Sequence, residues 1–380
     1  MHLFARCSFH MISSTGILTI DLSAIKSNWL YISALLRKGA VCAAAIKADA
    51  YGVGAVQVAN ALYSVGCRHF YVVTLHEAVE LRNNLPDDIA LYVLGGVPDE
   101  MEYVFVDLNL IPVLYSSLAV QRWMSFCGAQ QHAFPCVLKL NTGMTRLGLD
   151  DSDLDMILSV STDRTYLKPV IVMSHLACAD EPSHPLNNEQ LHRFNAALSK
   201  IKTFYPDIKS SLANSSGTLL DESYHFDMVR IGAALYGINP QTASPNPLKP
   251  AIHLKLPVLQ IRTIEKPESV GYGATALVDK GIRLAVAAGG YADGTHRSLG
   301  SAPKGQVDGI EVKAIGRTSM DSCVFDLSTV EGDPLYIDVI NNELTLDYLM
   351  NANKSLGYEV LTSLSRRYRR RYIFSGDNNE

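Results

Sequence analysis

The sequence predicts an α/β protein, a (β/α)8 barrel followed by a mostly β C-terminal domain. Three observations lead to this fold class: short apolar runs alternate with segments of helical period, the runs number eight, and the pattern changes near Asn239. Near-continuous apolar strands are typical of a parallel sheet that is buried on both faces. Eight such strands alternating with helices favour a closed barrel over an open doubly wound sheet.

The eight apolar runs are rich in β-branched residues and are the predicted barrel strands. They cover residues 41–47, 69–75, 89–94, 110–115, 134–140, 169–176, 208–214 and 228–236. Segments with one apolar helical stripe lie between or before them, most clearly at 21–37 and 187–204. The helix predicted at 99–108, between the third and fourth runs, is short. The order therefore predicts strand and helix in alternation.

Residues after Asn239 differ in character from the barrel. The stretch 239–250 contains four prolines and predicts a linker. Strand-like runs bounded by turn signals follow at 256–264, 283–288, 310–315 and 322–326, and helical period returns only near 344–352 and 358–368. This pattern predicts a β-rich domain.

The expected organisation has four parts. They are an extension over residues 1–15, a barrel domain over 16–245, a β-rich domain over 246–368 and a tail over 369–380. The strand-like segment 16–20 precedes the barrel and could pair with the C-terminal domain.

Composition bounds the class of protein. The 380 residues are 48% hydrophobic and 19% charged with a net charge of −5, which allows a large core and favours neither nucleic acid nor an anionic membrane as a partner. No apolar stretch approaches the ~18 residues of a membrane span. The basic run at 366–371 favours a solvated face or a frayed tail over a specific anion site.

Cysteine usage indicates the redox compartment. The seven cysteines are scattered, their number is odd, and no Cys-x-x-Cys pair occurs. This pattern predicts a reducing compartment without a disulfide framework, and no metal site. The first fifteen residues lack the apolar core and small-residue cleavage pattern of a signal peptide. We therefore expect a cytoplasmic location.

Polar residues at the C-terminal ends of the predicted strands are the candidates for a site, because barrels of this kind build their active sites there. Lys47 ends the first run, directly after a buried segment. By position alone it is more often a lysine whose stem is buried and whose amine reaches water. The alternative is an amine with a depressed pKa, suited to Schiff-base chemistry. The other strand ends favour this second interpretation.

Further cations follow the fifth and sixth runs. Lys139 ends the fifth run, and Arg146 in the following turn is placed to grip a carboxylate through two hydrogen bonds. His175 follows the sixth run, where a lone histidine is more often structural than catalytic.

A phosphate site is predicted after the seventh and eighth runs. Asn214 and Ser215 open a short predicted helix, and hydroxyls with backbone N–H groups at a helix start bind phosphate. The loops after strands seven and eight are the usual phosphate site of this fold. Arg230 and Gly232 belong to the eighth run. A reactive lysine and a phosphate site in one barrel mouth suggest pyridoxal 5′-phosphate (PLP) as cofactor.

Three glycine-rich phrases mark the C-terminal domain. They cover residues 271–275, 289–294 and 316–321, and the first two place Tyr272 and Tyr291 between glycines. One such phrase alone favours an aromatic residue in a turn. Three in one short domain favour a shared cleft.

The chain resembles the alanine racemase family, PLP enzymes of fold type III, from about Thr19 to Arg367. The phrases that carry the resemblance follow the family's order and spacing. They are Lys47-Ala-Asp-Ala-Tyr-Gly, Asn141-Thr-Gly-Met, Arg230-Ile-Gly-Ala-Ala-Leu-Tyr-Gly, Gly290-Tyr-Ala-Asp-Gly and Ser319-Met-Asp. The resemblance implies a homodimer with active sites shared between subunits. It also implies that L-alanine and D-alanine are interconverted by two bases, to supply D-alanine for peptidoglycan.

The resemblance further implies a role for each matching residue. Lys47 would hold PLP as a Schiff base and act as one base, and Tyr272 of the partner subunit would act as the other. The cofactor-binding set would be Lys47 with Tyr51, Ser215, Gly232, Ala233 and Tyr358 at the phosphate, Arg230 at the pyridine nitrogen, and His175 and Asn214 nearby. Arg146 and the backbone of Met320 would receive the substrate carboxylate, Tyr291 would narrow the entrance, and Lys139 matches a lysine that is often carbamylated.

Two bases suit racemisation, because a proton must leave Cα on one face and return on the other. The chain also departs from the family pattern at three positions. Val53 stands where the family commonly has histidine, Ser211 where some members have histidine, and Ser319 where some have cysteine. The change at Ser211 bears on how Arg230 and His175 are supported.

Other classes remain as alternatives. A PLP-binding homeostasis protein without turnover would resemble the barrel alone, and the phrases that contain Tyr272 and Met320 disfavour it. A decarboxylase of the same fold type would need a cysteine and an acidic pair in the second domain, and Cys323 lacks that setting. An oxidoreductase without PLP is disfavoured because no Gly-x-Gly-x-x-Gly follows the first strand.

Overall fold

The computed structural model describes residues 15–159, 163–241, 243–294, 304–353 and 356–374. The chain divides into two compact units. The barrel unit comprises Asp21–Ala251 and, among the described residues at the end of the chain, Phe374, and the β unit joins the N-terminal segment up to Ile20 with Ile252–Ile373. The predicted extension lies outside the described residues apart from Thr15, as does the end of the predicted tail from residue 375.

The barrel unit contains one sheet of eight parallel strands within the described residues. They are β2 (Val41–Ala45), β3 (His69–Val72), β4 (Ala90–Val93), β5 (Leu110–Leu114), β6 (Pro135–Lys139), β7 (Lys168–Met173), β8 (Lys209–Ser211) and β9 (Met228–Ile231). The sheet order runs from β8 down to β2 and then to β9. Backbone hydrogen bonds of 3.0 Å from Asp227 N to Ser210 O and from Arg230 N to Ala213 O join its two ends. The predicted barrel is thereby confirmed.

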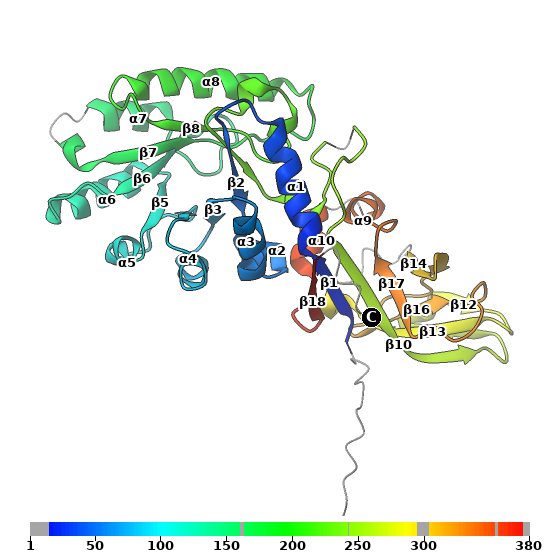
Figure 1. Ribbon diagram of the computed structural model, residues 1–380. Coiled ribbons are helices and arrows are strands. Elements are labelled where there is room, and N and C mark those ends of the chain that lie inside the picture. The colour runs from blue at the N-terminus through cyan, green and yellow to red at the C-terminus, as the bar shows by residue number, and fades with distance from the viewer. Residues whose placement is uncertain (1–14, 160–162, 242, 295–303, 354–355, 375–380) are drawn as a thin grey trace, which may run out of the picture. The chain divides into compact units, whose positions relative to one another are not determined.

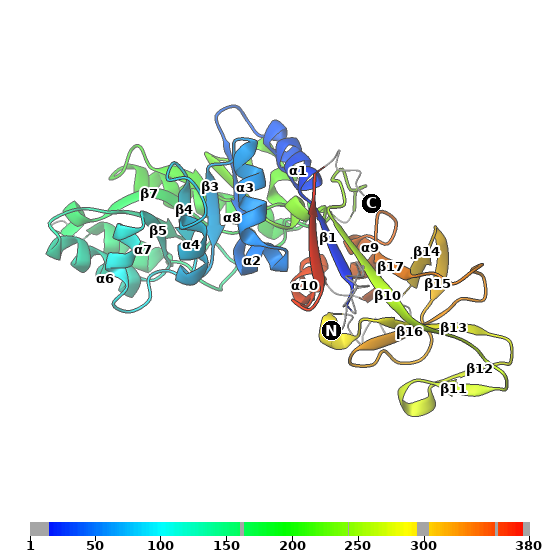
Figure 2. The same ribbon diagram turned by 60° about the horizontal axis from the view of Figure 1, so that its bottom comes forward.

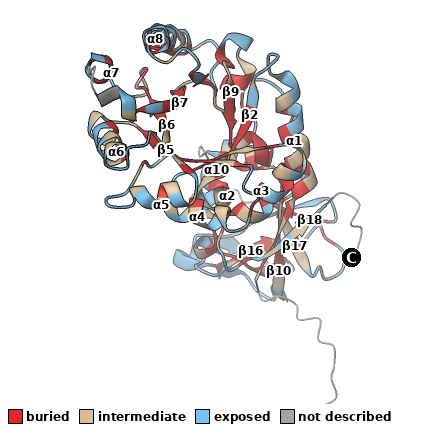
Figure 3. Ribbon diagram, turned by 60° about the vertical axis from the view of Figure 1, so that its left-hand side comes forward, coloured by how far each residue is buried: buried red, intermediate tan, exposed pale blue. Residues whose placement is uncertain are grey.

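Helices surround this ring of strands (Figure 3). They are α1 (Leu22–Leu35), α2 (Lys47–Gly52), α3 (Ala55–Ser64), α4 (Leu75–Arg82), α5 (Glu102–Asp107), α6 (Ser117–Ala129), α7 (Asp151–Ser159) and α8 (Pro185–Lys202), with 3-10 turns η1 (Asp163–Tyr166), η2 (Gly217–Leu219), η3 (Glu222–Tyr224) and η4 (Ala233–Tyr236). The helices predicted at 21–37 and 187–204 are α1 and α8. Asp21 caps α1, because its Oδ1 accepts from the N–H groups of Ser23 and Ala24.

Apolar side chains fill the inside of the barrel. The cluster contains Ala43, Tyr71, Tyr92, Val113, Val137, Ile171, Met173 and Met228, all buried. The rings of Tyr71 and Tyr92 stack with centroids 4.4 Å apart. This apolar cluster fills the inside of the barrel, so the polar side chains of the strands lie at their C-terminal ends.

The β unit is built mainly of antiparallel strands. They are β1 (Ile17–Asp21), β10 (Ile252–Thr263), β11 (Glu268–Val270), β12 (Ala276–Val278), β13 (Arg283–Ala288), β14 (Lys304–Val307), β15 (Ile310–Lys313), β16 (Ser322–Asp326), β17 (Tyr336–Ile340) and β18 (Arg369–Ile373), with α9 (Leu346–Asn353), α10 (Gly357–Ser363), η5 (Tyr272–Ala274) and η6 (Tyr291–Asp293). The main sheet has the order β15-β14-β17-β10-β1-β18, and β13 pairs with β10 and β16.

The first strand of the chain belongs to this second unit. β1 pairs antiparallel with β10, with Ile17 opposite Lys255 and Ile20 opposite Ile252. Figures 1 and 2 both show β1 beside β10. Among the described residues no helix is long and apolar enough to cross a membrane.

Two observed boundaries differ from the expected organisation. Residues 246–251, expected in the C-terminal domain, lie in the barrel unit, because the linker ends only where β10 begins. Arg369–Ile373, expected in a tail, form β18 at the end of the main sheet. Three consecutive arginines, Arg369–Arg371, begin this edge strand, and charged side chains on an edge discourage the pairing of further strands.

Candidate active site

Lys47 begins a turn of unusual hand. It follows β2 and opens α2, in which Ala48, Asp49, Ala50 and Tyr51 all have φ between 52° and 60°. These dihedrals are those of a left-handed helix, which costs L-residues about 1–2 kcal/mol each. Four successive residues other than glycine in this region persist only where their surroundings hold them.

Neighbouring groups hold the left-handed turn. The Glu77 carboxylate in α4 accepts from the N–H of Ala48, and the Asp49 carboxylate accepts from the N–H of Ala55 at 2.8 Å. Ala50 N–H donates to the carbonyl of Ile46 at 2.9 Å. The turn therefore fixes the backbone on which both Lys47 and Tyr51 are mounted.

Tyr51 lies close to the end of β9, the strand that pairs with β2. A Cβ added to Gly232 would lie 2.3 Å from the Tyr51 hydroxyl oxygen, so only glycine allows this approach. The Ser215 hydroxyl oxygen accepts from the N–H groups of Gly232 at 3.0 Å and Ala234 at 3.4 Å. Two hydroxyls and the backbone amides that start η4, where Ala233 is the first residue, thus lie together. We call this group the hydroxyl cradle.

Asn214 shapes the loop beside the cradle. Its amide Nδ2 donates to the carbonyl of Leu176 at 3.3 Å, and its Oδ1 accepts from Gly217 N–H at 2.9 Å, where η2 begins. The helix predicted here is a single 3-10 turn, Gly217–Leu219. Both bonds fix the loop and place Ser215 next to β9.

Arg230 is a buried cation at the end of β9. Its guanidinium donates to the Ser211 hydroxyl and to the carbonyls of Ser174 and Leu212. Burial lowers its pKa to about 10. The guanidinium remains protonated near neutral pH, and in the described residues only neutral oxygens and a ring nitrogen bond it.

Ser211 holds the Arg230 guanidinium by a hydrogen bond. The Ser211 hydroxyl accepts from Arg230 and donates to the carbonyl of Met228 at 2.7 Å. Ser211 therefore links the Arg230 guanidinium to the backbone of β9. His175 Nδ1 lies 3.4 Å from Arg230 Nη2. Burial and the nearby cations, with Arg230 first among them, keep the pKa of His175 well below its usual range, so the imidazole is neutral.

Lys47 and Lys139 complete a cationic barrel mouth. The pKa of Lys47 is lowered by burial and by Arg146, whereas Glu77 raises it. Lys139 is 7% exposed, and its pKa falls to about 8 because of burial and because Arg146, Arg230 and Lys47 are near. Three of the predicted cations, Arg146, Arg230 and Lys47, therefore lower the pKa of the fourth, Lys139. Such a site favours anionic ligands.

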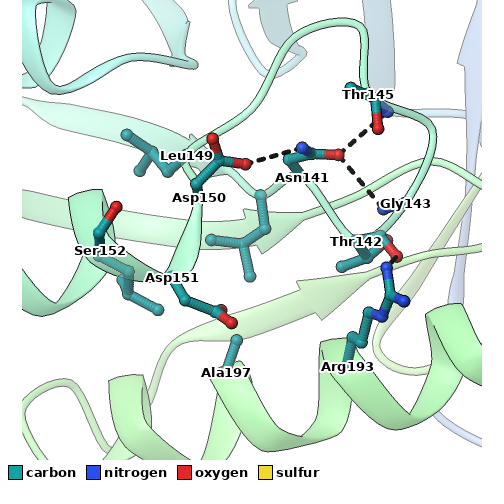
Figure 4. A pocket seen from close by; sticks show the side chains of 12 residues that line it. Asn141, Thr142, Gly143, Thr145, Leu149, Asp150, Asp151, Ser152, Arg193 and Ala197 are labelled. Atoms are coloured by element: carbon teal, nitrogen blue, oxygen red, sulfur yellow. Dashed lines mark hydrogen bonds between the residues drawn. The ribbon is translucent and has the colours of Figure 1, made fainter.

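Arg146 lies on a loop that Asn141 organises. Asn141 Oδ1 accepts from the N–H groups of Gly143 and Thr145, and its Nδ2 donates to Asp150 at 2.7 Å (Figure 4). A pocket of about 440 Å³ lies beside this loop, between it and Arg193 of α8 (Figure 4). Its lining contains none of the predicted site residues among those described, so the predicted chemistry does not use this pocket.

Tyr272 stands at the tip of a hairpin in the β unit. It begins η5 between β11 and β12 and is 66% exposed. Gly271 and Gly273 on either side have φ of 76° and 73°. The hairpin lies against the third glycine-rich phrase, because a Cβ on Gly271 would be 3.2 Å from Arg317 N.

The second and third glycine-rich phrases also meet. Tyr291 N–H donates to Ser319 O at 3.1 Å, and Ala292 N–H to Met320 O at 3.0 Å. A Cβ on Gly290 would lie 2.3 Å from both carbonyls, so this contact requires glycine. Tyr291 and Met320 are exposed, at 42% and 54%, as is Tyr358 at 42% at the start of α10. The three phrases converge within the β unit.

Sequence reasoning missed the ion pair that ties these loops together. Arg367 donates to both oxygens of buried Asp293, each at 2.7 Å, and to Asp321 at 2.8 Å. These carboxylates raise the pKa of Arg367. Within the basic run, then, Arg367 is a specific partner of loop carboxylates and not part of a frayed tail. Glu77 was missed as well, although Thr74-x-x-Glu77 before a helical stripe is the sequence pattern of a capping box.

The chain combines a parallel barrel with a separate β unit. The barrel mouth holds a half-buried lysine and several cations. These features define a class of barrel proteins that bind an anionic ligand at the strand ends. Comparison with known families narrows this class. Residues 20–240 match the family described as alanine racemase, N-terminal domain, and residues 251–372 match alanine racemase, C-terminal domain. The chain belongs to the alanine racemase family.

Relatives and solved structures agree with this assignment. The chain is 42% identical to alanine racemase of Rhodospirillum rubrum over 96% of this chain and 97% of the relative. It is 38% identical to a catabolic alanine racemase of Mesorhizobium japonicum over 94% and 93%. The crystal structure of alanine racemase from Bartonella henselae with covalently bound pyridoxal phosphate superimposes with a TM-score of 0.89, at 34% identity over 94% of this chain and 99% of that one.

Proposed function

We propose that this protein is an alanine racemase that interconverts L-alanine and D-alanine with PLP as its cofactor. The observation that carries the proposal is the juxtaposition of Lys47, an amine of lowered pKa, with Tyr51 and the hydroxyl cradle through one short turn. The fold and the family of the chain support it.

The residues at the barrel mouth fit PLP on three counts. The hydroxyls of Tyr51 and Ser215 are groups suited to a phosphate, and they lie beside the amides of Gly232 and Ala234, which donate to Ser215 Oγ. Lys47 offers an amine whose neutral form is favoured by burial, as covalent attachment requires. Arg230, protonated and held by Ser211, is a fixed donor for the ring nitrogen. Tyr358 of the β unit is proposed as a further phosphate donor.

PLP supplies an electron sink that makes the Cα–H bond of a bound amino acid acidic. We assign Lys47 as the base on one face of the substrate and the partner subunit's Tyr272 as the base on the other. The exposure of Tyr272 at the tip of a glycine-flanked hairpin supports a role outside its own unit. Because Arg230 would not give up its proton, it would leave the pyridine nitrogen of PLP unprotonated, which would weaken the electron sink and disfavour side reactions.

Other side chains bind and orient the substrate. Arg146, exposed on the loop that Asn141 organises, and the backbone of Met320 are proposed to receive the substrate carboxylate. Tyr291 is proposed to narrow the entrance, and His175 to stand between Tyr272 and Arg230. Lys139 is proposed to carry a carbamate. A buried amine of pKa about 8 among cations supports this, since a carbamate would convert it into an anion facing Arg146.

The cellular role and assembly follow from the same proposal. We propose a cytoplasmic homodimer that supplies D-alanine for peptidoglycan. Rescue of a bacterium that requires D-alanine would support this role, whereas failure of an active enzyme to rescue it would contradict it.

The proposed function is tested first at Lys47. The purified protein with PLP is expected to show a visible absorbance band and to racemise alanine, measured by the loss of optical rotation. Lys47→Ala should lose the band and lower kcat to the assay limit, because both the attachment point and one base are removed. Lys26→Ala, a change in α1, serves as control and should leave both unchanged. A coloured protein that binds PLP without racemising any amino acid would instead favour a homeostasis role.

A further inference from the structure

We infer that Glu77 is a positioning residue that fixes the left-handed turn after Lys47 and thereby sets the orientation of the lysine amine. The inference rests on the proposed function of Lys47 as cofactor anchor and base. It concerns a residue that neither contacts the reacting atoms nor belongs to the motifs of the barrel mouth. The two oxygens of its carboxylate have separate tasks.

One oxygen caps a helix. Glu77 Oε2 accepts from the N–H groups of Val73 at 2.8 Å and Thr74 at 2.9 Å, and the Thr74 hydroxyl accepts from Glu77 N–H at 3.2 Å. This is a complete capping box, which needs only one acceptor on residue 77. A helix cap alone would account for this half of the side chain.

The other oxygen leaves the helix. Glu77 Oε1 accepts from the N–H of Ala48, 29 positions earlier in the chain and directly after Lys47. Ala48 is the first of the four left-handed residues, so this bond holds the turn at its origin. A side chain that only capped α4 would not need to reach Ala48 in α2. The tether is therefore a second function of Glu77.

Charge gives the tether a second effect. The groups facing the Lys47 amine are Arg146, Lys139 and His175 from the loops and strands around the mouth, and Glu77 from α4. Of these, Glu77 raises the pKa of Lys47, whereas Arg146 lowers it. Loss of the Glu77 charge should therefore lower the pKa of Lys47 further.

The substitution Glu77→Gln separates the two oxygens. Glutamine keeps one acceptor for the capping box but presents an NH2 group to the N–H of Ala48, which leaves two donors facing each other. In the apoprotein we expect the pH midpoint for amine-selective labelling of Lys47, followed by peptide mass spectrometry, to fall by about half a unit or more. With PLP bound, kcat should fall by about tenfold or more, because the lysine amine is misplaced.

Matched variants separate positioning from simple loss of structure. Thr74→Ala removes the hydroxyl side of the same capping box, and Glu80→Gln removes a charge from the same helix, without touching Ala48. Both should keep the labelling midpoint and kcat of the wild type, although Thr74→Ala should lower Tm. Glu77→Asp, which keeps the charge but shortens the reach, should lower kcat and leave the midpoint closer to that of the wild type.

The outcomes distinguish this inference from the proposed function. If Glu77→Gln has the same pH midpoint of Lys47 labelling and the same kcat as Thr74→Ala, the inference is overturned. The proposed function still holds in that case if the wild type racemises alanine. A wild type that does not racemise would overturn the function, and the apoprotein labelling would then still decide whether Glu77 acts on Lys47. If Glu77→Gln does not fold, Glu77→Asp decides, and an unchanged kcat in that variant counts against the tether.

Discussion

Lys139 is a cation in a place that disfavours cations. It is buried at the end of β6 with Arg146, Arg230 and Lys47 as neighbours, and its pKa is lowered from an ordinary value near ~10.4 to about 8. At pH 8 about half of the amine is therefore neutral, and only a neutral amine takes up carbon dioxide. Below that pH, protonation of the Lys139 amine competes with carbamate formation. Above that pH, most of the amine is neutral and this competition ends.

The carbamate proposed on Lys139 can be observed directly. Wild-type protein in ¹³C-bicarbonate at pH 8 should give a carbamate signal by carbon NMR that weakens as the pH falls below the pKa of Lys139. Lys139→Gln should lose the signal and lower kcat/KM by about tenfold through a less well oriented Arg146. Lys168→Gln, an exposed lysine at the start of β7, is the matched control and should keep both. A wild type without the signal would refute the carbamate.

At this scale the sequence predicted residues that sit at strand ends and missed those that act through others. Lys47 and Lys139 could be placed because each lies at the end of a buried apolar run, and Arg230 because it interrupts one. Glu77 and Arg367 could not, because their partners are 29 and 74 positions away and a hydrogen bond across such a distance leaves no periodic trace.

The left-handed turn in α2 lies close to the start of η4 at the barrel mouth. The left-handed turn brings Tyr51 over the first residues after β9, and Gly232 is the residue that allows it. A methyl group there would force the Tyr51 hydroxyl to move, and forced overpacking costs about 1–3 kcal/mol.

Gly232→Ala should therefore weaken the binding of PLP more than it weakens folding. We expect the Kd for PLP, measured by titrating the apoprotein, to rise by about tenfold or more. Gly128→Ala in α6 provides the comparison, because a Cβ on Gly128 would meet the Tyr166 ring at an ordinary contact distance of 3.5 Å. Equal affinities for PLP in the two variants would show that the approach of Tyr51 does not shape the phosphate site.

Regular elements were predictable and irregular ones were not. The eight strands and the helices α1 and α8 follow from apolar period, because each buries one face or both. The left-handed turn Ala48–Tyr51 has no such signal, since residues other than glycine seldom adopt positive φ. The strands β11, β12, β14 and β17 were missed because they are short or only half buried.

At the scale of the whole molecule, the proposal that the two bases come from different subunits makes a quantitative prediction. Lys47→Ala and Tyr272→Phe homodimers should each be nearly inactive. If mixed subunits re-associate freely, half of the dimers are mixed and each mixed dimer has one intact site of two. The mixture should therefore recover about a quarter of wild-type activity.

The control for this experiment mixes two variants of the same residue. Lys47→Ala with Lys47→Gln should recover nothing, because every site then lacks the lysine. Activity that stays at the level of the separate variants, with subunit exchange verified by mass spectrometry, would place both bases within one chain.

The division of the chain was predictable in outline. The proline-rich stretch marks the end of the barrel, but the start of β10 at Ile252 is set by its pairing with β1 and β17, which sequence alone does not reveal. β18 was hidden by its charge, because five arginines in a short segment resemble a solvated end more than a strand.

The pairing of β1 has a consequence for the order of events on the ribosome. β1 is translated before the whole barrel, whereas its two neighbours in the sheet, β10 and β18, are translated after it and at the end of the chain. Asp21 N–H bonds Ala251 O at 2.8 Å, so the barrel segment closes on itself between these strands. A nascent chain thus carries an unpaired apolar strand throughout synthesis of the barrel. Synthesis of β10 gives β1 its first partner, and only the completed C-terminus, which contains β18, covers its other edge against chaperones and other nascent chains.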